Sequence, residues 1–182
     1  MPKIKEPSHD YLIYNIAMNK VLELLQKDQE NIKLFKAGEK TAEEMHKTNE
    51  GISHEFLKIV EKKGFPYKNR VTYEVYKAGI TLALHFSPDS LEKIFTDLEK
   101  LDKNEFDLGD KAYFIDRLRL FKNQKQVYGT QFKKDIAGNI SFFPIEDEDN
   151  VDKRRSGVGL CTLSEYLDFI NGKRNSAKKD EN

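Results

Sequence analysis

Apolar residues recur every three or four positions through much of this chain, and this spacing limits its fold more than any other feature. The first such series runs through Tyr14, Met18, Val21 and Leu25. Because an α-helix has about 3.6 residues per turn, side chains at this spacing line one face of a helix. Charged residues make up 34% of the chain and hydrophobic residues only 38%, so each helix should carry one apolar stripe on a solvated body. The pattern predicts a mainly α fold.

Capping residues indicate where these helices begin and end. Ser8 is expected to cap the first helix, and Thr41 with Glu44 and Thr162 with Glu165 have the spacing of capping boxes. The expected helices span about 8–38, 41–64, 69–86, 88–101, 110–122 and 163–172, with a short basic helix around Arg154 and Arg155 after the acidic run 146–149.

The pattern changes after Asn123, where alternation replaces helical spacing. Segments 126–132 and 139–143 are expected to form two short strands joined by a turn at Gly138 and Asn139. The sequence therefore predicts a single-domain bundle of about five to six helices over residues 1–172. A C-terminal β-hairpin at about 126–143 should pack on it, and residues 173–182 should form a disordered polar tail.

Composition excludes several classes of protein. The 31 basic and 31 acidic residues balance, whereas a general nucleic-acid binder needs surplus positive charge. No apolar run approaches the roughly 20 residues of a membrane span. With one cysteine the chain can form no internal disulfide, which is typical of a reducing compartment. We expect a soluble cytoplasmic protein that binds neither nucleic acid nor a membrane, and its oligomeric state is left open.

Three helices place a polar residue where the apolar series reserves a core position. These residues are Asp28, Asn49 and His85. Because burying a polar group without a partner costs roughly 1 to 3 kcal/mol, such residues should meet one another or a ligand. The pattern predicts a shared polar pocket. The alternative is that each residue forms a structural hydrogen bond, His85 within the core and the others between helices or at the surface.

The segment 126–131 is polar on both alternations of its expected strand, which a purely structural hairpin does not need. Gly129 lies in the middle and would let another group approach the backbone, either a ligand or a tightly packed neighbour. Asp116 and Arg117 are adjacent on the expected helix before it and should point about 100° apart. They form either part of a cavity wall or a solvated face.

One stretch carries a resemblance to a known family. The segment AYFIDRLRLFKNQKQVYGTQF, followed by GNISFFPIEDEDNVDKRRSGVGLCTLSEYL, resembles the C-terminal half of the uncharacterised family DUF6624, with its D-R, Q-x-Y-G-T-Q, P-I-E-D, V-D-x-R-R and V-G-L motifs. A looser resemblance extends upstream to about Leu24, through Asp28 with Gln29, the G-F-P string at 64–66 and His85. Where the family often has arginine and glutamine, this chain has Ile32 or Lys33 and Leu84.

The resemblance implies no reaction, but it implies which positions matter. The residues that match signature positions are Asp28, His85, Asp116, Arg117, Gln126, Tyr128, Thr130 and Gln131. They overlap the polar residues found in the apolar faces.

Two functional hypotheses follow, together with a structural one. In the first, the protein is an enzyme of hydrolase or lyase type, with His85 as general acid or base oriented by Asp28 or Asp116. Arg117 would bind a small anionic or amide-bearing substrate, together with Asn49, Gln126, Tyr128, Thr130 and Gln131. In the second, the same pocket is a non-catalytic module for a small ligand or a peptide. In the third, these residues form one structural network.

Neither a metal nor another cofactor is expected. His46 and His54 lie eight residues apart, more than two helical turns, and the acidic run lacks the glycine and spacing of a calcium loop.

Overall fold

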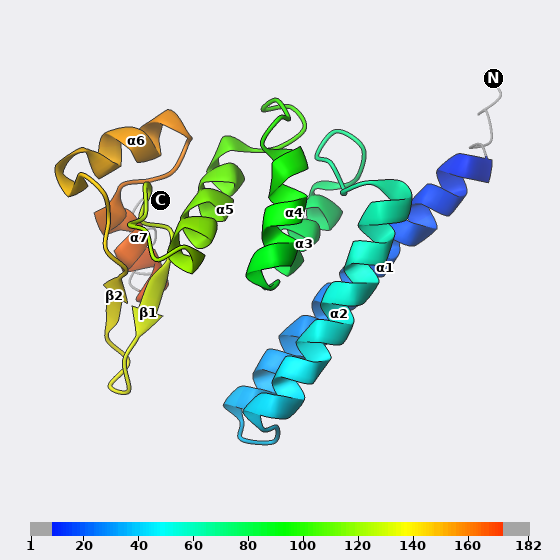
Figure 1. The fold of residues 1–182 in the computed structure, drawn as a ribbon, viewed down its shortest axis with the longest axis horizontal. Coiled ribbons are helices and arrows are strands. Elements are labelled where there is room, and N and C mark those ends of the chain that lie inside the picture. Colours follow the sequence, from blue (N-terminus) through cyan, green and yellow to red (C-terminus); the bar gives the residue numbers. More distant parts are fainter. Residues whose placement is uncertain (1–8, 173–182) are drawn as a thin grey trace, which may run out of the picture. The chain divides into compact units, whose positions relative to one another are not determined.

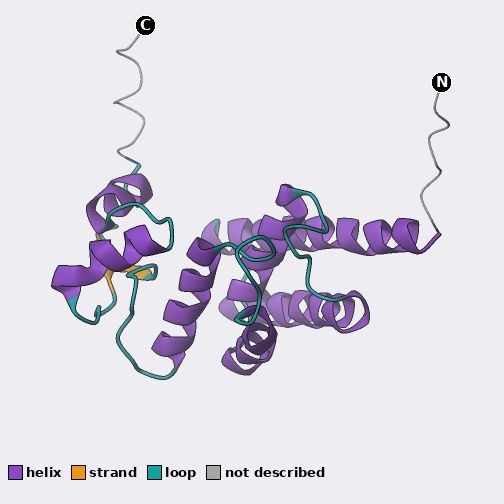
Figure 2. Ribbon diagram, turned by 90° about the horizontal axis from the view of Figure 1, so that it is seen from above, coloured by secondary structure: helices purple, strands orange, loops and turns teal. Residues whose placement is uncertain are grey.

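The computed structural model describes residues 9–172, which form seven α-helices and one two-stranded sheet (Figures 1 and 2). The helices are α1 (His9–Lys36), α2 (Ala42–Lys63), α3 (Tyr73–Leu84), α4 (Pro88–Leu98), α5 (Leu108–Phe121), α6 (Val151–Gly157) and α7 (Leu163–Ile170), with a 3₁₀ turn η1 (Glu148–Asn150) before α6. The strands are β1 (Phe132–Lys134) and β2 (Ile140–Phe142). The predicted mainly α fold with a C-terminal hairpin is confirmed. The predicted cap at Ser8 and the polar tail over 173–182 lie outside the described residues.

The chain divides into two compact units, and the division falls within α4. Unit 1 comprises Met1–Ile94 and Asn104–Phe106, and unit 2 comprises Phe95–Lys103 and Asp107–Asn182. The predicted single domain over residues 1–172 stays a prediction.

In unit 1, α1 and α2 lie side by side and α3 packs against both (Figure 1). The predicted capping box is present, since the Thr41 hydroxyl accepts from the Glu44 backbone and the Glu44 carboxylate accepts from the Thr41 backbone. Phe56 of α2 is fully buried and meets the rings of Phe65 and Phe86 edge-on, at centroid distances of 6.0 and 5.6 Å. Burying such a side chain stabilises a fold by about 1.5–3 kcal/mol.

The buried face of α1 is partly polar. Its buried residues are Met18, Val21, Leu24, Asp28 and Asn31. The prediction that Asp28 occupies the buried face is confirmed. The buried face contains Leu24 and Asn31 where the sequence predicted Leu25 and Ile32. Leu24 and Leu25 are equally apolar, so the spacing did not distinguish the two faces, and an asparagine was not expected at a buried position.

Helix α3 is shorter than the predicted span 69–86, and seven of its 12 residues are buried. The Thr72 side chain caps its first turn by accepting from Val75, and His85 follows its last residue with φ −90° and ψ −1°. Gly79 leaves room for Pro66, because a Cβ at position 79 would lie 2.5 Å from the Pro66 ring. This close approach packs the middle of α3 against the G-F-P segment.

In unit 2, the hairpin is shorter than predicted. Strand β1 begins at Phe132 and pairs antiparallel with β2, with Phe132 opposite Phe142 and Lys134 opposite Ile140. The predicted turn is confirmed, since Asn139 donates its backbone N–H to the Asp135 carboxylate and Gly138 has φ 88°. Residues 126–131, expected as strand, form a loop instead. Most of their backbone N–H and C=O groups bind side chains rather than the backbone of a partner strand.

Every residue of helix α5 from Asp110 to Leu120 is buried or half-buried. Phe114 on this helix stacks on Phe95 with the ring centroids 5.7 Å apart. Across the part of the chain that the structure describes, no helix is both long and apolar enough to cross a membrane.

Candidate functional site

The clearest polar pair in unit 1 joins α1 to the end of α3. The Nδ1 atom of His85 lies 3.0 Å from Oδ1 and 3.1 Å from Oδ2 of Asp28. Asp28 is 2% exposed, whereas the His85 side chain is 36% exposed. The Gln29 amide donates to Oδ2 of Asp28 at 3.0 Å. Since a carboxylate can only accept, Nδ1 of His85 carries a proton. The sequence prediction that these two polar residues meet is confirmed.

The other ring nitrogen of His85 has no protein partner among the described residues. The hydrogen bonds of this side chain all run through Nδ1, and more than a third of the side chain is exposed. A histidine whose Nδ1–H is fixed by a carboxylate presents the lone pair of Nε2 in a defined direction. This arrangement can accept and return a proton at Nε2.

Asn49, the third predicted residue, belongs to a different set of contacts. Its Oδ1 accepts from Nδ2 of Asn31 at 2.8 Å, and the same nitrogen donates to the Met45 carbonyl at 3.0 Å. Lys40 Nζ lies 2.7 Å from Oδ1 of Asn31. These bonds tie α1 to α2 and do not include His85. Asn31 was missed from the sequence, although it lies three residues after Asp28 on the same face.

In unit 2, Asp116 binds residues 126–131, which we call the anchored loop. Its Oδ1 accepts from the backbone N–H groups of Val127 at 2.7 Å and Tyr128 at 3.1 Å. Its Oδ2 accepts from the backbone N–H and the hydroxyl of Thr130, both at 2.9 Å. The carboxylate is fully buried, and these four donors engage both of its oxygens. Asp116 therefore serves as an internal anion around which the loop folds.

Two arginines of α6 bind the carbonyl groups of the same loop. Arg154 Nε donates to Val127 O at 2.8 Å, and Arg155 Nη1 donates to Tyr128 O at 2.7 Å. Arg155 is 1% exposed and lies over the ring of Tyr166 at 5.1 Å. The loop thus directs N–H groups toward a buried carboxylate and carbonyls toward a buried guanidinium. Each buried charge is stabilised by peptide dipoles.

Further hydrogen bonds within unit 2 involve Gln126, Thr130 and Gln131. The Gln126 amide donates to the carbonyls of Gln131 at 3.0 Å and Phe143 at 2.9 Å, and its oxygen accepts from the Gln131 N–H at 2.7 Å. The hydroxyl of Tyr166 donates to Thr130 O at 3.1 Å. The Gln126 side chain, predicted to bind substrate, therefore binds the backbone of Gln131 and Phe143, and the Thr130 hydroxyl, also predicted to bind substrate, binds Asp116 and Gln131.

At Gly129 the sequence left open whether a ligand or a packed neighbour approaches the backbone. It has φ 65°, and a Cβ there would lie 2.8 Å from Cδ1 of Ile145 and 2.9 Å from Cδ1 of Leu163. The group that approaches this glycine is therefore a packed side chain of the protein.

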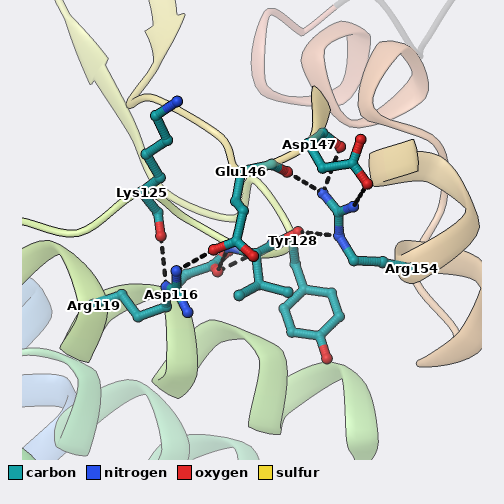
Figure 3. Close-up of polar contacts among 8 residues, drawn as sticks. Asp116, Arg119, Lys125, Tyr128, Glu146, Asp147 and Arg154 are labelled. Atoms are coloured by element: carbon teal, nitrogen blue, oxygen red, sulfur yellow. Dashed lines mark hydrogen bonds and ion pairs between the residues drawn. The ribbon is translucent and has the colours of Figure 1, made fainter. Parts of the chain in front are cut away.

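The beginning of the anchored loop is held next to the acidic run 146–149, since the backbone N–H of Glu146 donates to the Gln126 carbonyl at 2.8 Å. Figure 3 shows Arg119 between the Lys125 carbonyl, which it binds at 2.6 Å, and the Glu146 carboxylate. Arg154 binds the carbonyls of Glu146 and Asp147, the latter at 2.9 Å. Exposed ion pairs of this kind contribute little, about 0–1 kcal/mol each, but the backbone bonds fix the loop.

Tyr128 contributes only its backbone to these contacts, and its ring points away from the Asp116 carboxylate (Figure 3). The sequence reasoning missed Arg154, Arg155 and Tyr166 as part of this cluster. The signal for the arginines was present in the V-D-x-R-R string.

Arg117 differs from its neighbours because its hydrogen bonds are incomplete. Nη1 donates to Oε1 of Gln131 at 3.2 Å, the guanidinium lies 5.3 Å from the ring centroid of Phe121, and Nε is buried without a partner. Burial lowers the pKa of the Arg117 guanidinium. The residue faces a pocket of about 570 Å³, which we call the Arg117 pocket and which is lined by Arg117, Leu120, Phe121, Asn123, Gln124, Lys125, Phe143 and Pro144.

The predicted residues thus gather in two places. His85 and Asp28 form a pair in unit 1, whereas Asp116, Arg117, Gln126, Tyr128, Thr130 and Gln131 gather around the anchored loop in unit 2. The shared pocket predicted from the sequence stays a prediction. Within residues 9–172, no three His, Cys, Asp or Glu side chains group in a way that would hold a metal ion.

The comparison with known families agrees with the resemblance. A family model described as a family of unknown function, DUF6624, matches residues 75–175, which include His85 and the anchored loop but not Asp28. No curated protein and no solved structure matches the chain. Because the match covers more than half of the 182 residues, the chain belongs to the family DUF6624.

Proposed function

We propose that this protein is an enzyme that uses the His85–Asp28 pair for general acid–base catalysis. The observation that carries the proposal is the geometry of the pair: Nδ1 of an exposed imidazole is held 3.0 Å from a buried carboxylate. A structural tether needs only that bond. The accessible Nε2 is the part of the arrangement that a tether does not require.

The chemistry follows from which atoms are occupied. Nε2 of His85 accepts a proton from a bound water or a substrate group, and the imidazolium that forms lies against the Asp28 carboxylate. Asp28 stabilises that charge and fixes the ring, and Gln29 holds the carboxylate in turn. The proton then returns from Nε2 to the leaving group. Asp28 rather than Asp116 is the proposed partner of His85, because the oxygens of Asp116 are engaged by the anchored loop.

The reaction class we propose is hydrolysis or elimination on a small anionic or amide-bearing molecule. We place the enzyme in the cytoplasm, because a chain with one cysteine can form no internal disulfide. Balanced charge argues against nucleic acid as the substrate.

The test is a panel of chromogenic probes, namely p-nitrophenyl acetate, p-nitrophenyl phosphate and an acyl p-nitroanilide. Turnover should fall about 100-fold or more in His85→Gln and in Asp28→Asn, since a positioned acid–base group contributes roughly 10²–10⁴-fold. The matched controls are His46→Gln and Glu50→Gln, which remove an exposed pair on α2 with Nε2 and Oε1 3.3 Å apart. Equal turnover in wild type and His85→Gln contradicts the proposal.

A second candidate, a non-catalytic binding module, is favoured by the Arg117 pocket. Under that proposal the probes are not turned over, and ligand binding does not respond to His85→Gln.

A further inference from the structure

We propose that the Arg117 pocket binds a small monocarboxylate with an apolar body, its carboxylate on Arg117 and its hydrocarbon part against Leu120, Phe121 and Phe143. The pocket lies within unit 2. The proposal is independent of the His85–Asp28 pair, which lies in unit 1.

The first argument is that Arg117 is a charge without a counter-charge. No carboxylate pairs with it in the described part of the chain, and the adjacent Asp116 gives both oxygens to the anchored loop. Its buried Nε has no hydrogen-bond partner. A desolvated guanidinium with unpaired donors is costly, and an anion that supplies the missing acceptors recovers that cost.

The second argument is which guanidinium donors of Arg117 lack a protein acceptor. Gln131 occupies Nη1, so the opposite edge of the guanidinium, formed by Nε and Nη2, has no protein acceptor. Two parallel N–H groups on one edge match the two oxygens of a carboxylate. The Phe121 ring, 5.3 Å from the guanidinium, restricts its orientation before a ligand arrives.

The third argument is the character of the walls. Leu120, Phe121, Phe143 and Pro144 supply apolar surface, and Phe121 remains 37% exposed. A volume of about 570 Å³ lies within the roughly 300–1,000 Å³ typical of small-molecule sites. The half-buried guanidinium of Arg117 beside these apolar walls matches a ligand that has one carboxylate and a hydrocarbon part, and Asn123, Gln124 and Lys125 complete the lining.

The experiment titrates full-length protein with octanoate, with 1-octanol as the uncharged analogue and acetate as the analogue without an apolar body. Chemical-shift changes in ¹H–¹⁵N spectra report both affinity and location. Octanoate should bind with its shifts centred on residues 117–125 and on Phe143. Arg117→Gln should weaken octanoate binding about tenfold or more, as should replacing octanoate by octanol or by acetate.

The matched control is Arg70→Gln, because Arg70 also lies over an aromatic ring, Tyr67 at 5.1 Å, but lines no part of this pocket. It should leave octanoate binding unchanged, as should His85→Gln. If Arg117→Gln fails to fold, Arg117→Lys keeps the charge, loses the paired donors and should still weaken binding. The proposal is overturned if octanol binds as tightly as octanoate, if the Arg117 variants bind octanoate like wild type, or if octanoate does not bind.

Discussion

Two buried aspartates on helices, Asp28 in unit 1 and Asp116 in unit 2, differ in what they bind. Asp116 accepts four hydrogen bonds from one loop, and all of its partners are themselves buried or half-buried. Asp28 accepts from Gln29 and from His85, whose side chain is 36% exposed and whose Nε2 has no partner among the described residues. The first carboxylate completes a closed set of bonds, and the second orients a group that still has bonding capacity.

Unused donors and acceptors distinguish structural from functional polar residues better than the exposed fraction does. Both aspartates are at most 2% exposed, so burial ranks them alike. Counting unused donors and acceptors ranks them apart, because a satisfied network stabilises a loop while an unused nitrogen or guanidinium can act on a ligand. By this criterion His85 and Arg117 are the candidates for function, whereas the side chains of Asp116, Gln126 and Thr130 already bind groups of the protein.

The largest expected effect is on Asp116. Asp116→Asn places an amide –NH₂ among donors and leaves buried N–H groups without an acceptor. It also removes the charge that faces the loop dipoles. The free energy of unfolding should fall by about 3–5 kcal/mol, which lowers Tm by roughly 10 °C. Urea unfolding followed by circular dichroism measures the loss. Glu146→Gln, at an exposed carboxylate, is the control and should change stability by less than about 1 kcal/mol.

The next largest effect is expected at Gly129, where the side chains of Ile145 and Leu163 pack against the anchored loop. Gly129→Ala forces a Cβ into Ile145 and Leu163 at a positive φ, and should cost about 2–3 kcal/mol. Gly138→Ala also has a positive φ but meets nothing within 4 Å, so it should cost only about 1 kcal/mol. Thermal unfolding of the two variants separates packing from backbone strain. Equal losses would mean that Gly129 does not need its space.

The sequence predicted the helices well because their signals are local. Capping boxes at Thr41 and Thr162 and the glycine after Lys63 fixed helix ends that the structure reproduces. Helical spacing also identified Asp28 as a polar residue in a buried face, since that inference needs only the neighbours along one helix. His85 was found in the same way, although it caps α3 instead of lying within the helix.

The anchored loop could not be predicted because its cause is not local. Residues 126–131 alternate like a strand, but their N–H groups bind a carboxylate 11 to 14 positions earlier and their carbonyls bind arginines 26 or 27 positions later. Nothing in the alternation pattern encodes those partners. The Arg117 pocket was missed for the same reason, since its walls come from α5, the segment that follows α5 and the two residues after β2.

A smaller effect, with a pH dependence, is expected at Tyr166. Its hydroxyl donates to Thr130 O, and burial raises the pKa of that hydroxyl above its ordinary value. The folded state therefore holds the proton more tightly than the unfolded state. That stabilisation is full below about pH 10 and is lost as pH rises through the folded pKa. Tyr166→Phe should cost about 1 kcal/mol at neutral pH.

The gap between wild type and Tyr166→Phe should narrow in urea titrations above about pH 10. Tyr73→Phe is the control, because Tyr73 is 60% exposed. A gap that stays constant to the alkaline limit would contradict the assigned role of the hydroxyl.

The smallest expected effect on stability is at His85. This prediction is the most direct test of the comparison between the two aspartates. His85→Gln keeps an amide donor for Asp28 and replaces a side chain that is already 36% exposed, so it should change the free energy of unfolding by less than about 1 kcal/mol. Asp116→Asn, measured in the same urea titrations, should cost several times more. His46→Gln sets the baseline for an exposed histidine. If His85→Gln were as damaging as Asp116→Asn, the His85–Asp28 pair would be a tether between α1 and α3. The open Nε2 would then carry no functional meaning.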